Sequence, residues 1–324
     1  MGQNKMKGAS EDAVLKGLNW LQENQNEDGS WGDRSPGAMT GLALLCFLGH
    51  GETPESPQYG HTVKRAVQWF LDNGTKFEGR LSMAKRFSYS GVYDHAIGTY
   101  ALGEFYTMTR DERVLGIYKK AVDYIVEGQG PTGGWHASYS RPGGDLSVSG
   151  WQIQALKAAH LTQLELPGVD QALDRAMEYV DSMRGPKGGY GYQNTPHDGY
   201  TLSGVGMLCR LFWKCKPSDV SKSMEWMIEQ TEKKYPVKYN SGSGNLYTWY
   251  YNTQACLMYG DSAWTKWNGW FQDELVGVQN PDGSWPEPGY RGFGVSGKSK
   301  VVYHTTLSIL MLEVFYRYMP TTQG

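Results

Sequence analysis

The chain of 324 residues has few cysteines, little net charge and no long uninterrupted apolar run. Its four cysteines show no CxxC spacing, so we expect reduced core residues, with zinc or disulfides as the alternatives. The formal net charge of -2 gives no electrostatic footprint for nucleic acid, which excludes it as an expected partner. No apolar run reaches transmembrane length, so at most a peripheral membrane contact is left open.

No signal peptide is recognised at the N-terminus. Residues 1–9 are expected to be a leader or disordered, and residues 320–324 a short tail. The polar start resembles an expression leader, behind which an export signal could have been removed. We expect the chain to be soluble as given, and its compartment stays open between the bacterial cytoplasm and the periplasm.

An internal repeat is the strongest signal in the sequence. Six small-residue dipeptides, at intervals of 49 to 58 residues, each open an apolar helical stretch: Thr40-Gly41, Gly98-Thr99, Ser149-Gly150, Ser203-Gly204, Asn252-Thr253 and Thr305-Thr306. Self-similarity at a period of this length indicates stacked or closed repeats. Small residues fit a design in which helix backbones approach one another closely around an axis.

Each unit pairs a helix that has a polar face with a helix that is apolar all round. The stretch 40–48, for example, is apolar on every side, which predicts burial on every side. Outer helices are expected from about residue 10 and over 61–73, 111–128, 169–184, 219–233 and 263–278. Inner helices are expected over 40–48, 94–107, 147–161, 201–214, 248–259 and 303–318.

These helices predict an all-α α6/α6 toroid, a closed barrel of six hairpins, as a single domain over residues 10–319. An open solenoid is the alternative, and it would need polar capping repeats at both ends. The last inner stretch, 306–316, is as apolar as the central ones, which favours closure.

A turn motif accompanies the repeat. In three units a Gln precedes a Gly-(Ser/Gly)-Trp turn at identical spacing: Gln25 to Trp31, Gln129 to Trp135 and Gln279 to Trp285. A fourth unit carries a degenerate form of this turn at 188–190. These elements resemble the QW repeat of squalene–hopene cyclases and other terpenoid cyclases, a toroid superfamily that includes protein prenyltransferase β subunits and prenyltransferase/squalene oxidase repeat proteins. The resemblance implies an α6/α6 barrel in which the Gln and Trp tie an outer helix to its turn.

The sequence departs from the chemistry of those families. Only the first Asp of the cyclase proton-donor motif is present, as Asp145, and the donor position is Ser147. His304 matches one prenyltransferase zinc ligand, while the Asp-x-Cys pair falls near Tyr247 and Trp249. A catalytic zinc needs at least three protein ligands. We therefore expect no metal and no cofactor, and leave open whether the chain is an enzyme.

Starts of inner helices should surround one opening of the central cavity. The candidate catalytic residues there are Asp94, His95, Asp145 and His304. The candidate ligand-binding residues are Trp151, Asp198, Tyr200, Tyr247, Trp249, Tyr250, Tyr251 and Tyr303. A carboxyl set against aromatic surface would act as a general acid or base. The alternative is that each Asp caps a helix and His95 bonds a neighbouring loop.

The function expected from this pattern is a terpene cyclase-like toroid, of the isomerase/lyase class if it is catalytic. It would bind an isoprenoid or another apolar small molecule in an aromatic central cavity. Two alternatives stay open: a non-catalytic toroid that binds a peptide, a protein or a glycan, and a polysaccharide lyase or hydrolase. The sequence does not indicate an oligomeric state.

Overall fold

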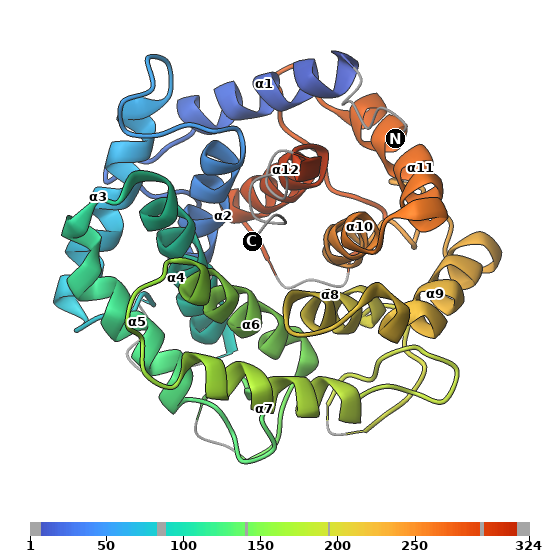
Figure 1. Cartoon of the computed structure of the whole chain (residues 1–324). Helices are drawn as coiled ribbons and strands as arrows, with labels where there is room; N and C mark the ends of the chain where they lie inside the picture. Colours follow the sequence, from blue (N-terminus) through green and yellow to red (C-terminus); the bar gives the residue numbers. More distant parts are fainter. Residues whose placement is uncertain (1–7, 83–88, 140–141, 194, 292–294, 316–324) are drawn as a thin grey trace.

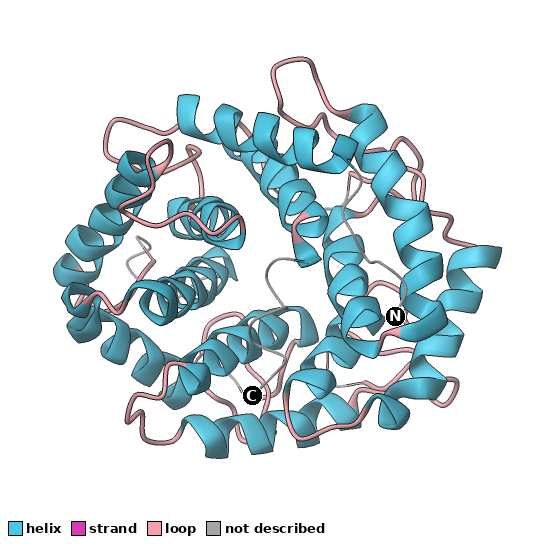
Figure 2. Ribbon diagram, turned by 45° about the horizontal axis from the view of Figure 1, so that its top comes forward, coloured by secondary structure: helices cyan, strands magenta, loops and turns pink. Residues whose placement is uncertain are grey.

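The computed structural model describes residues 8–82, 89–139, 142–193, 195–291 and 295–315. These residues form twelve α-helices and two short 3₁₀ helices, and the only β pairing among them is isolated bridges. Figure 1 shows the helices in two concentric rings, and Figure 2 shows the same arrangement from another side. The predicted all-α toroid is confirmed.

The outer ring contains α1 (Gly8–Glu23), α3 (Gly60–Lys76), α5 (Leu115–Glu127), α7 (Val169–Ser182), α9 (Ser221–Lys233) and α11 (Asp261–Val278). The inner ring contains α2 (Pro36–Gly49), α4 (Tyr89–Thr109), α6 (Leu146–Leu161), α8 (Ser203–Phe212), α10 (Leu246–Tyr259) and α12 (Lys298–Leu312). The 3₁₀ helices, Glu112–Val114 and Pro217–Val220, precede α5 and α9. Most of α2 is buried on all sides, whereas α3 and α7 bury one face, as the apolar patterns predicted.

The Gln–Trp turns join neighbouring outer helices. The Gln25 side-chain amide donates to the carbonyl oxygen of Gly29 in its own turn and to that of Thr62 in α3, at 2.9 and 3.0 Å. The Trp31 indole N–H donates back to the carbonyl oxygen of Leu21 at 2.8 Å. The Thr40 hydroxyl accepts the backbone N–H of Trp31 at 3.2 Å. Equivalent bonds form around Gln129 with Trp135 and around Gln279 with Trp285.

The small dipeptides allow inner helices to approach one another closely, as the sequence predicted, and they also bond the aromatic turns. A Cβ on Gly41 would meet the carbonyl oxygen of Ile97 in α4 at 2.9 Å, and one on Gly204 would meet the backbone nitrogen of Asn252 in α10 at 2.7 Å. Inner helices therefore touch backbone to backbone at these positions. In addition, hydroxyl groups of the dipeptides cap the aromatic turns, as Thr40 does for Trp31.

Helix starts differ in detail from the predicted ones. α1 begins at Gly8, two residues before the predicted start at about residue 10. α2 begins four residues before the predicted start at residue 40, because Pro36 supplies a φ suited to a first helical turn. Residues 316–324, which include the predicted tail, lie outside the described residues. None of the described helices is both long and apolar enough to cross a bilayer.

Candidate functional site

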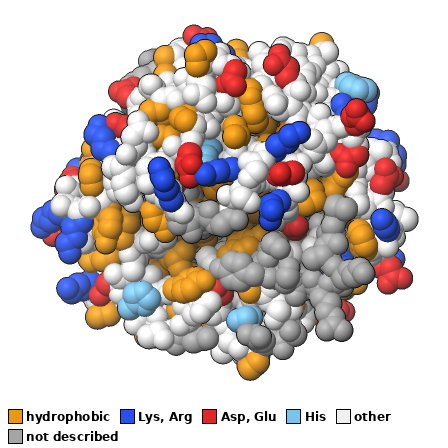
Figure 3. Space-filling model, turned by 180° about the vertical axis from the view of Figure 1, so that it is seen from behind, with side chains coloured by type: hydrophobic (Ala, Val, Ile, Leu, Met, Phe, Trp, Pro, Cys, Tyr) orange, Lys and Arg blue, Asp and Glu red, His pale blue; other side chains and the backbone are white. Residues whose placement is uncertain are grey.

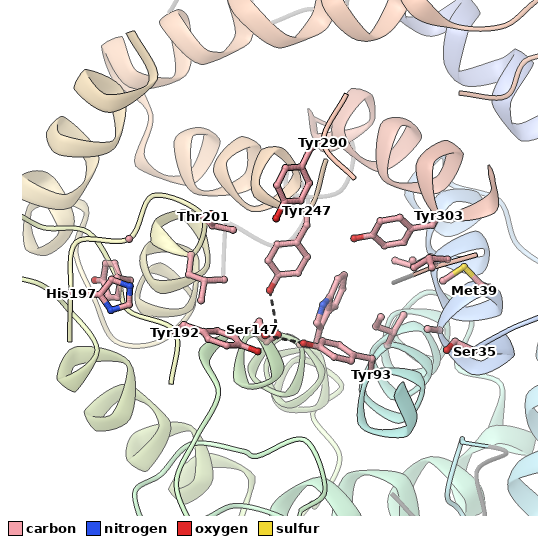
Figure 4. Close-up of a pocket in the computed structure, with 18 residues that line it drawn as sticks. Ser35, Met39, Tyr93, Ser147, Tyr192, His197, Thr201, Tyr247, Tyr290 and Tyr303 are labelled. Atoms are coloured by element: carbon pink, nitrogen blue, oxygen red, sulfur yellow. Dashed lines mark hydrogen bonds between the residues drawn. The ribbon is translucent and has the colours of Figure 1, made fainter. Parts of the chain in front are cut away.

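A pocket of about 590 Å³ lies within the inner ring, at the ends where α2, α6, α10 and α12 begin. Figure 4 shows its side chains converging from these helices and from the loops between them. The lining consists of Ser35, Ala38, Met39, Leu42, Tyr93, Ile97, Ser147, Trp151, Tyr190, Tyr192, His197, Gly199, Thr201, Leu202, Tyr247, Tyr290, Val295 and Tyr303. Figure 3, seen from behind, shows hydrophobic side chains gathered around a hollow in the middle of that face.

Aromatic rings dominate this lining: six tyrosines and one tryptophan. The ring of Tyr250 stacks on that of Trp151, with 5.4 Å between the ring centroids and an interplanar angle of 19°. Tyr250 and Tyr251 are buried, and their hydroxyls share the side-chain amide of Gln154. The predicted residues Trp151, Tyr247 and Tyr303 therefore line the pocket, while Tyr250 and Tyr251 support the lining from behind.

Trp249 differs from the prediction. Its indole N–H donates to the carbonyl oxygen of Ser243 at 3.1 Å, and its ring contacts Tyr239. The four aromatic residues of 247–251 are spread around α10 by the helical period, so one ring must face the outer layer. Trp249 is a core residue that anchors the loop before α10.

Asp145 caps α6. Its Oδ1 accepts the backbone N–H groups of Ser147 and Val148 at 2.9 and 3.2 Å and the Ser147 hydroxyl at 2.5 Å. Its Oδ2 accepts the Gln193 amide at 2.9 Å. The Ser147 hydroxyl lies 2.8 Å from that of Tyr93, and both of these residues line the pocket. Asp145, predicted as a catalytic residue, thus lies outside the lining and contacts the lining residue Ser147. Its role is the helix cap that the sequence analysis gave as the alternative.

Asp94 is buried beside the opposite wall. Its Oδ1 accepts the backbone N–H of Ala38 at 3.3 Å, so it caps α2 from the neighbouring helix. Burial raises the pKa of Asp94 to about 7, against bonds from Ala38 and Ser35 that favour the charged form. Ser35 adopts a left-handed conformation, φ 48° and ψ 53°, directly before Pro36. Asp94 itself is absent from the described lining, but Ser35 and Ala38 form part of it.

The two candidate histidines lie outside the lining. In His95, Nδ1 accepts the backbone N–H of Leu81 at 3.0 Å and Nε2 donates to the carbonyl oxygen of Ala121 at 2.9 Å. This pairing requires the neutral ring, and burial lowers the pKa of His95 to about 4. His95 therefore bonds neighbouring backbone, which is the alternative that the sequence analysis gave for it. His304 is buried on α12 beside Tyr303, and burial lowers its pKa to about 4 as well.

Asp198 and Tyr200 lie in a different hollow, of about 340 Å³, with Trp226 and Tyr235. The Asp198 carboxylate accepts the backbone N–H groups of Lys187 and Gly189, and Tyr200 stacks on Tyr235 at 4.3 Å. Their predicted place at the central cavity differs from the structure, because along the loop before α8 His197, Gly199 and Thr201 line the central pocket while Asp198 and Tyr200 line this second hollow.

Loop residues of the pocket were missed by the sequence reasoning. Tyr192, Thr201 and Tyr290 belong to connections between outer and inner helices, which carry no helical period. Tyr93, Ser147 and His197 also line the pocket. The glycine-rich, aromatic composition of 188–201 was a signal for a loop with a binding role.

The chemistry of the described lining is restricted. It contains no carboxylate, lysine or arginine, and His197 is its one group other than phenols that can titrate. Hydrolysis of glycosides ordinarily uses two carboxyl groups that flank the reacting bond. Among the described residues, no group of three or more His, Cys, Asp or Glu side chains is placed to hold a metal ion.

The sequence matches no family model and no curated protein. Its structure resembles an inactive variant of the α-1,6-mannanase of Salegentibacter sp. HEL1_6 in complex with α-1,6-mannotriose (TM-score 0.70, 12% identity, 95% of this chain and 99% of that chain). It also resembles cellobiose 2-epimerase from Spirochaeta thermophila (TM-score 0.68, 13% identity, 97% and 99%). A third similar structure is a type II terpene cyclase from Scytonema with geranylgeranyl dihydroxybenzoate (TM-score 0.57, 14% identity, 94% and 97%). At these identities the likeness shows a shared helical toroid.

Proposed function

We propose that the central pocket binds a segment of an uncharged glycan, and that the protein recognises this ligand without hydrolysing it through a carboxylate pair. The observation that carries the proposal is the lining: six phenols, one indole, hydroxyl groups and no described charged group around about 590 Å³. This volume falls within the range of about 300–1,000 Å³ that is usual for small-molecule sites.

Phenol and indole rings suit a sugar in two ways. Their faces pack against the apolar C–H faces of pyranose rings, and the phenol hydroxyls donate to or accept from sugar hydroxyls. Trp151, held flat by Tyr250, offers such a face. A charged sugar would need a compensating charge in the pocket, because burying an unpaired charge costs several kcal/mol or more. The described lining offers none, which favours a neutral glycan.

The comparisons support a glycan more than a terpene. The mannanase was solved with a mannotriose, and the epimerase takes its name from a disaccharide. Two carboxyl groups that bond lining residues, those of Asp94 and Asp145, accept backbone N–H groups from α2 and α6. This use of both carboxyl groups in helix capping is the reason for proposing recognition and not hydrolysis.

An isoprenoid or other apolar ligand is the second candidate. Met39, Leu42 and Ile97 form a continuous apolar part of the lining, on α2 and α4. The terpene cyclase with its geranylgeranyl ligand shares the fold. An apolar chain would, however, form no hydrogen bond with the hydroxyl groups of the lining, whereas the hydroxyls of a sugar could.

Calorimetric titration tests the proposal. The probes are α-1,6-mannotriose, cellobiose, other neutral mannose and glucose oligosaccharides, and geranylgeraniol in detergent. We expect saturable binding of a neutral oligosaccharide that weakens at least about tenfold, or about 1.4 kcal/mol, in Trp151→Leu. Trp270→Leu, on the partly exposed α11, is the matched control and should bind normally. Binding of geranylgeraniol with no binding of any oligosaccharide would overturn the proposal in favour of the second candidate.

A further inference from the structure

We propose that the second hollow, which lies beside α9, is a binding site of its own for a short neutral saccharide. Its lining consists of Lys187, Asp198, Tyr200, Trp226, Glu229, Gln230, Lys234 and Tyr235. Its volume of about 340 Å³ is near the lower end of the usual range of about 300–1,000 Å³, which suits a ligand shorter than that of the central pocket. The inference rests on the proposed function for the class of ligand, and it assigns the protein a second place at which that class binds.

The aromatic rings of the hollow are held in place by their neighbours. Tyr200 and Tyr235 stack on each other, with 4.3 Å between the ring centroids and an interplanar angle of 13°. The Tyr200 hydroxyl lies 2.8 Å from that of Thr231 in α9. Trp226 packs on the turn at Gly189, where an added Cβ would lie 2.9 Å from its ring. Rings held in this way lose little conformational freedom on binding. Tyr235 is exposed and Trp226 is half-buried, so both offer a surface on which a pyranose can pack.

Helix α9 brings polar groups to the same face as Trp226. Glu229 and Gln230 follow Trp226 by three and four residues, a spacing at which side chains are neighbours on a helix. Lys234 and Tyr235 come directly after the helix, and their backbone N–H groups both donate to the carbonyl oxygen of Gln230. Among the described residues, no hydrogen bond occupies the side-chain amide of Gln230, so this group can both donate to a ligand and accept from it.

The charges around the hollow balance. Two lysines and two carboxyl residues line it: Lys187, Lys234, Asp198 and Glu229. The ion pair with Lys233 lowers the pKa of Glu229 most, and the charges of Lys187 and Lys234 lower it further. A ligand with a net charge would be attracted by one pair of groups and repelled by the other, so the balance favours an uncharged ligand. The hydroxyls of a sugar can donate to the carboxylates and accept from the ammonium groups.

The second hollow and the central pocket lie on either side of one chain segment, the loop that precedes α8. Its residues His197, Gly199 and Thr201 line the central pocket, whereas Asp198 and Tyr200 line the second hollow. Alternate side chains of an extended segment point to opposite sides, which explains this division. The two described linings share no residue, so both sites can be occupied at the same time.

Nuclear magnetic resonance of the indole N–H groups, in the full chain labelled with nitrogen-15, tests the second site. The probes are glucose, mannose, cellobiose and α-1,6-mannotriose, each added separately. We expect a saturable shift of the Trp226 signal, and this shift should persist in Trp151→Leu, which impairs the central pocket. Trp226→Leu should lose that response, while the Trp151 signal still responds with unchanged affinity. Trp270→Leu, on α11, is the control and should keep both responses.

Glucuronate and glucosamine test the charge balance, because they add a negative or a positive charge to the glucose ring. Both should move the Trp226 signal only at severalfold higher concentration than glucose does.

The two tryptophan signals separate this inference from the proposed function. A response at Trp151 without one at Trp226 supports the proposed function and overturns the second site. A response at Trp226 without one at Trp151 overturns the proposed glycan in the central pocket and leaves the second site supported. The second site is also overturned if Trp151→Leu abolishes the Trp226 response, or if glucuronate or glucosamine moves that signal at lower concentration than glucose. Absence of both responses overturns both proposals.

Discussion

The side-chain amide of Gln279 donates to the carbonyl oxygen of Ala13 in α1 at 2.8 Å and to that of Gly283 at 2.9 Å, so the last repeat is bonded to the first. Gln25 and Gln129 make the same pair of bonds toward α3 and α7. The bond from the Gln side chain to the next outer helix joins neighbouring repeats at Gln25 and Gln129. At Gln279 the same bond closes the ring. The inner ring closes as well, because α12 packs on α2.

The first prediction concerns this closure. Replacing Gln279 by Ala removes both bonds, and we expect the free energy of unfolding to fall by about 1–3 kcal/mol. Urea denaturation followed by circular dichroism measures the change. Gln68→Ala is the control, because Gln68 is exposed and bonds only the nearby Asp72 within α3. Equal effects of the two substitutions would show that the bond from Gln279 to Ala13 does not contribute to stability.

The second prediction concerns His95. Its ring satisfies one buried N–H and one buried carbonyl oxygen, of Leu81 and Ala121. His95→Ala leaves both groups unpaired, and we expect a loss of about 2–5 kcal/mol in the free energy of unfolding. His61→Ala, at an exposed position of α3, should change it by less than about 0.5 kcal/mol.

The pH dependence of His95 has a definite sign. Its pKa is about 4 in the folded protein against an ordinary value of 6.5, so the unfolded chain binds a proton that the folded protein does not. The stability of wild type relative to His95→Ala should therefore be largest above pH 6.5 and decrease as the pH falls toward 4. A difference that grows on acidification would contradict the neutral, doubly bonded ring.

The third prediction concerns Asp94, whose pKa shifts in the opposite direction. Burial raises the pKa to about 7 from 3.8, so between these values the folded protein holds a proton that the unfolded chain has released. The contribution of Asp94 to stability is therefore greatest at acid pH and declines as the pH rises from about 4 to about 7. At 1.36 kcal/mol per pKa unit, the decline is on the order of 4 kcal/mol.

Asp94→Asn removes the titration and can still accept the N–H of Ala38 through its amide oxygen. We expect the variant to be more stable than wild type at pH 8 and similar at pH 4, as measured by thermal unfolding across this range. Asp12→Asn, at an exposed position of α1, is the control and should follow wild type. A variant that is destabilised at pH 8 would mean that the charged carboxylate of Asp94 is favoured in the folded protein.

The fold could be predicted from the sequence because its signals are periodic and local. The Gly-(Ser/Gly)-Trp turn recurs in three units and the alternation of half-apolar with fully apolar helices in six, so an error in one unit is corrected by the others. Ring closure could also be predicted, because the last inner stretch, 306–316, is as apolar as the central inner stretches.

The site was less accessible, for physical reasons that particular residues show. An Asp before an inner helix is equally compatible with capping and with catalysis, and only the four donors around Asp145 decide for capping. The partners of His95 lie 14 and 26 residues away along the chain, on elements whose contact no local pattern specifies. Tyr192 and Tyr290 reach the pocket from loops, where no period fixes the direction of a side chain.

The last prediction concerns the close approach of two inner helices at Gly204. A Cβ there would lie 2.2 Å from the Asn252 Oδ1 and 2.7 Å from its backbone nitrogen, so α8 and α10 would have to move apart. We expect Gly204→Ala to lower the free energy of unfolding by about 1–3 kcal/mol, although alanine favours helix. Gly116→Ala is the matched control on the exposed face of α5, where a Cβ meets nothing within 4 Å, and it should gain up to about 1 kcal/mol. If both alanines stabilise the protein in urea denaturation, the inner helices are not in backbone contact at Gly204, and the small dipeptides serve only to cap the aromatic turns.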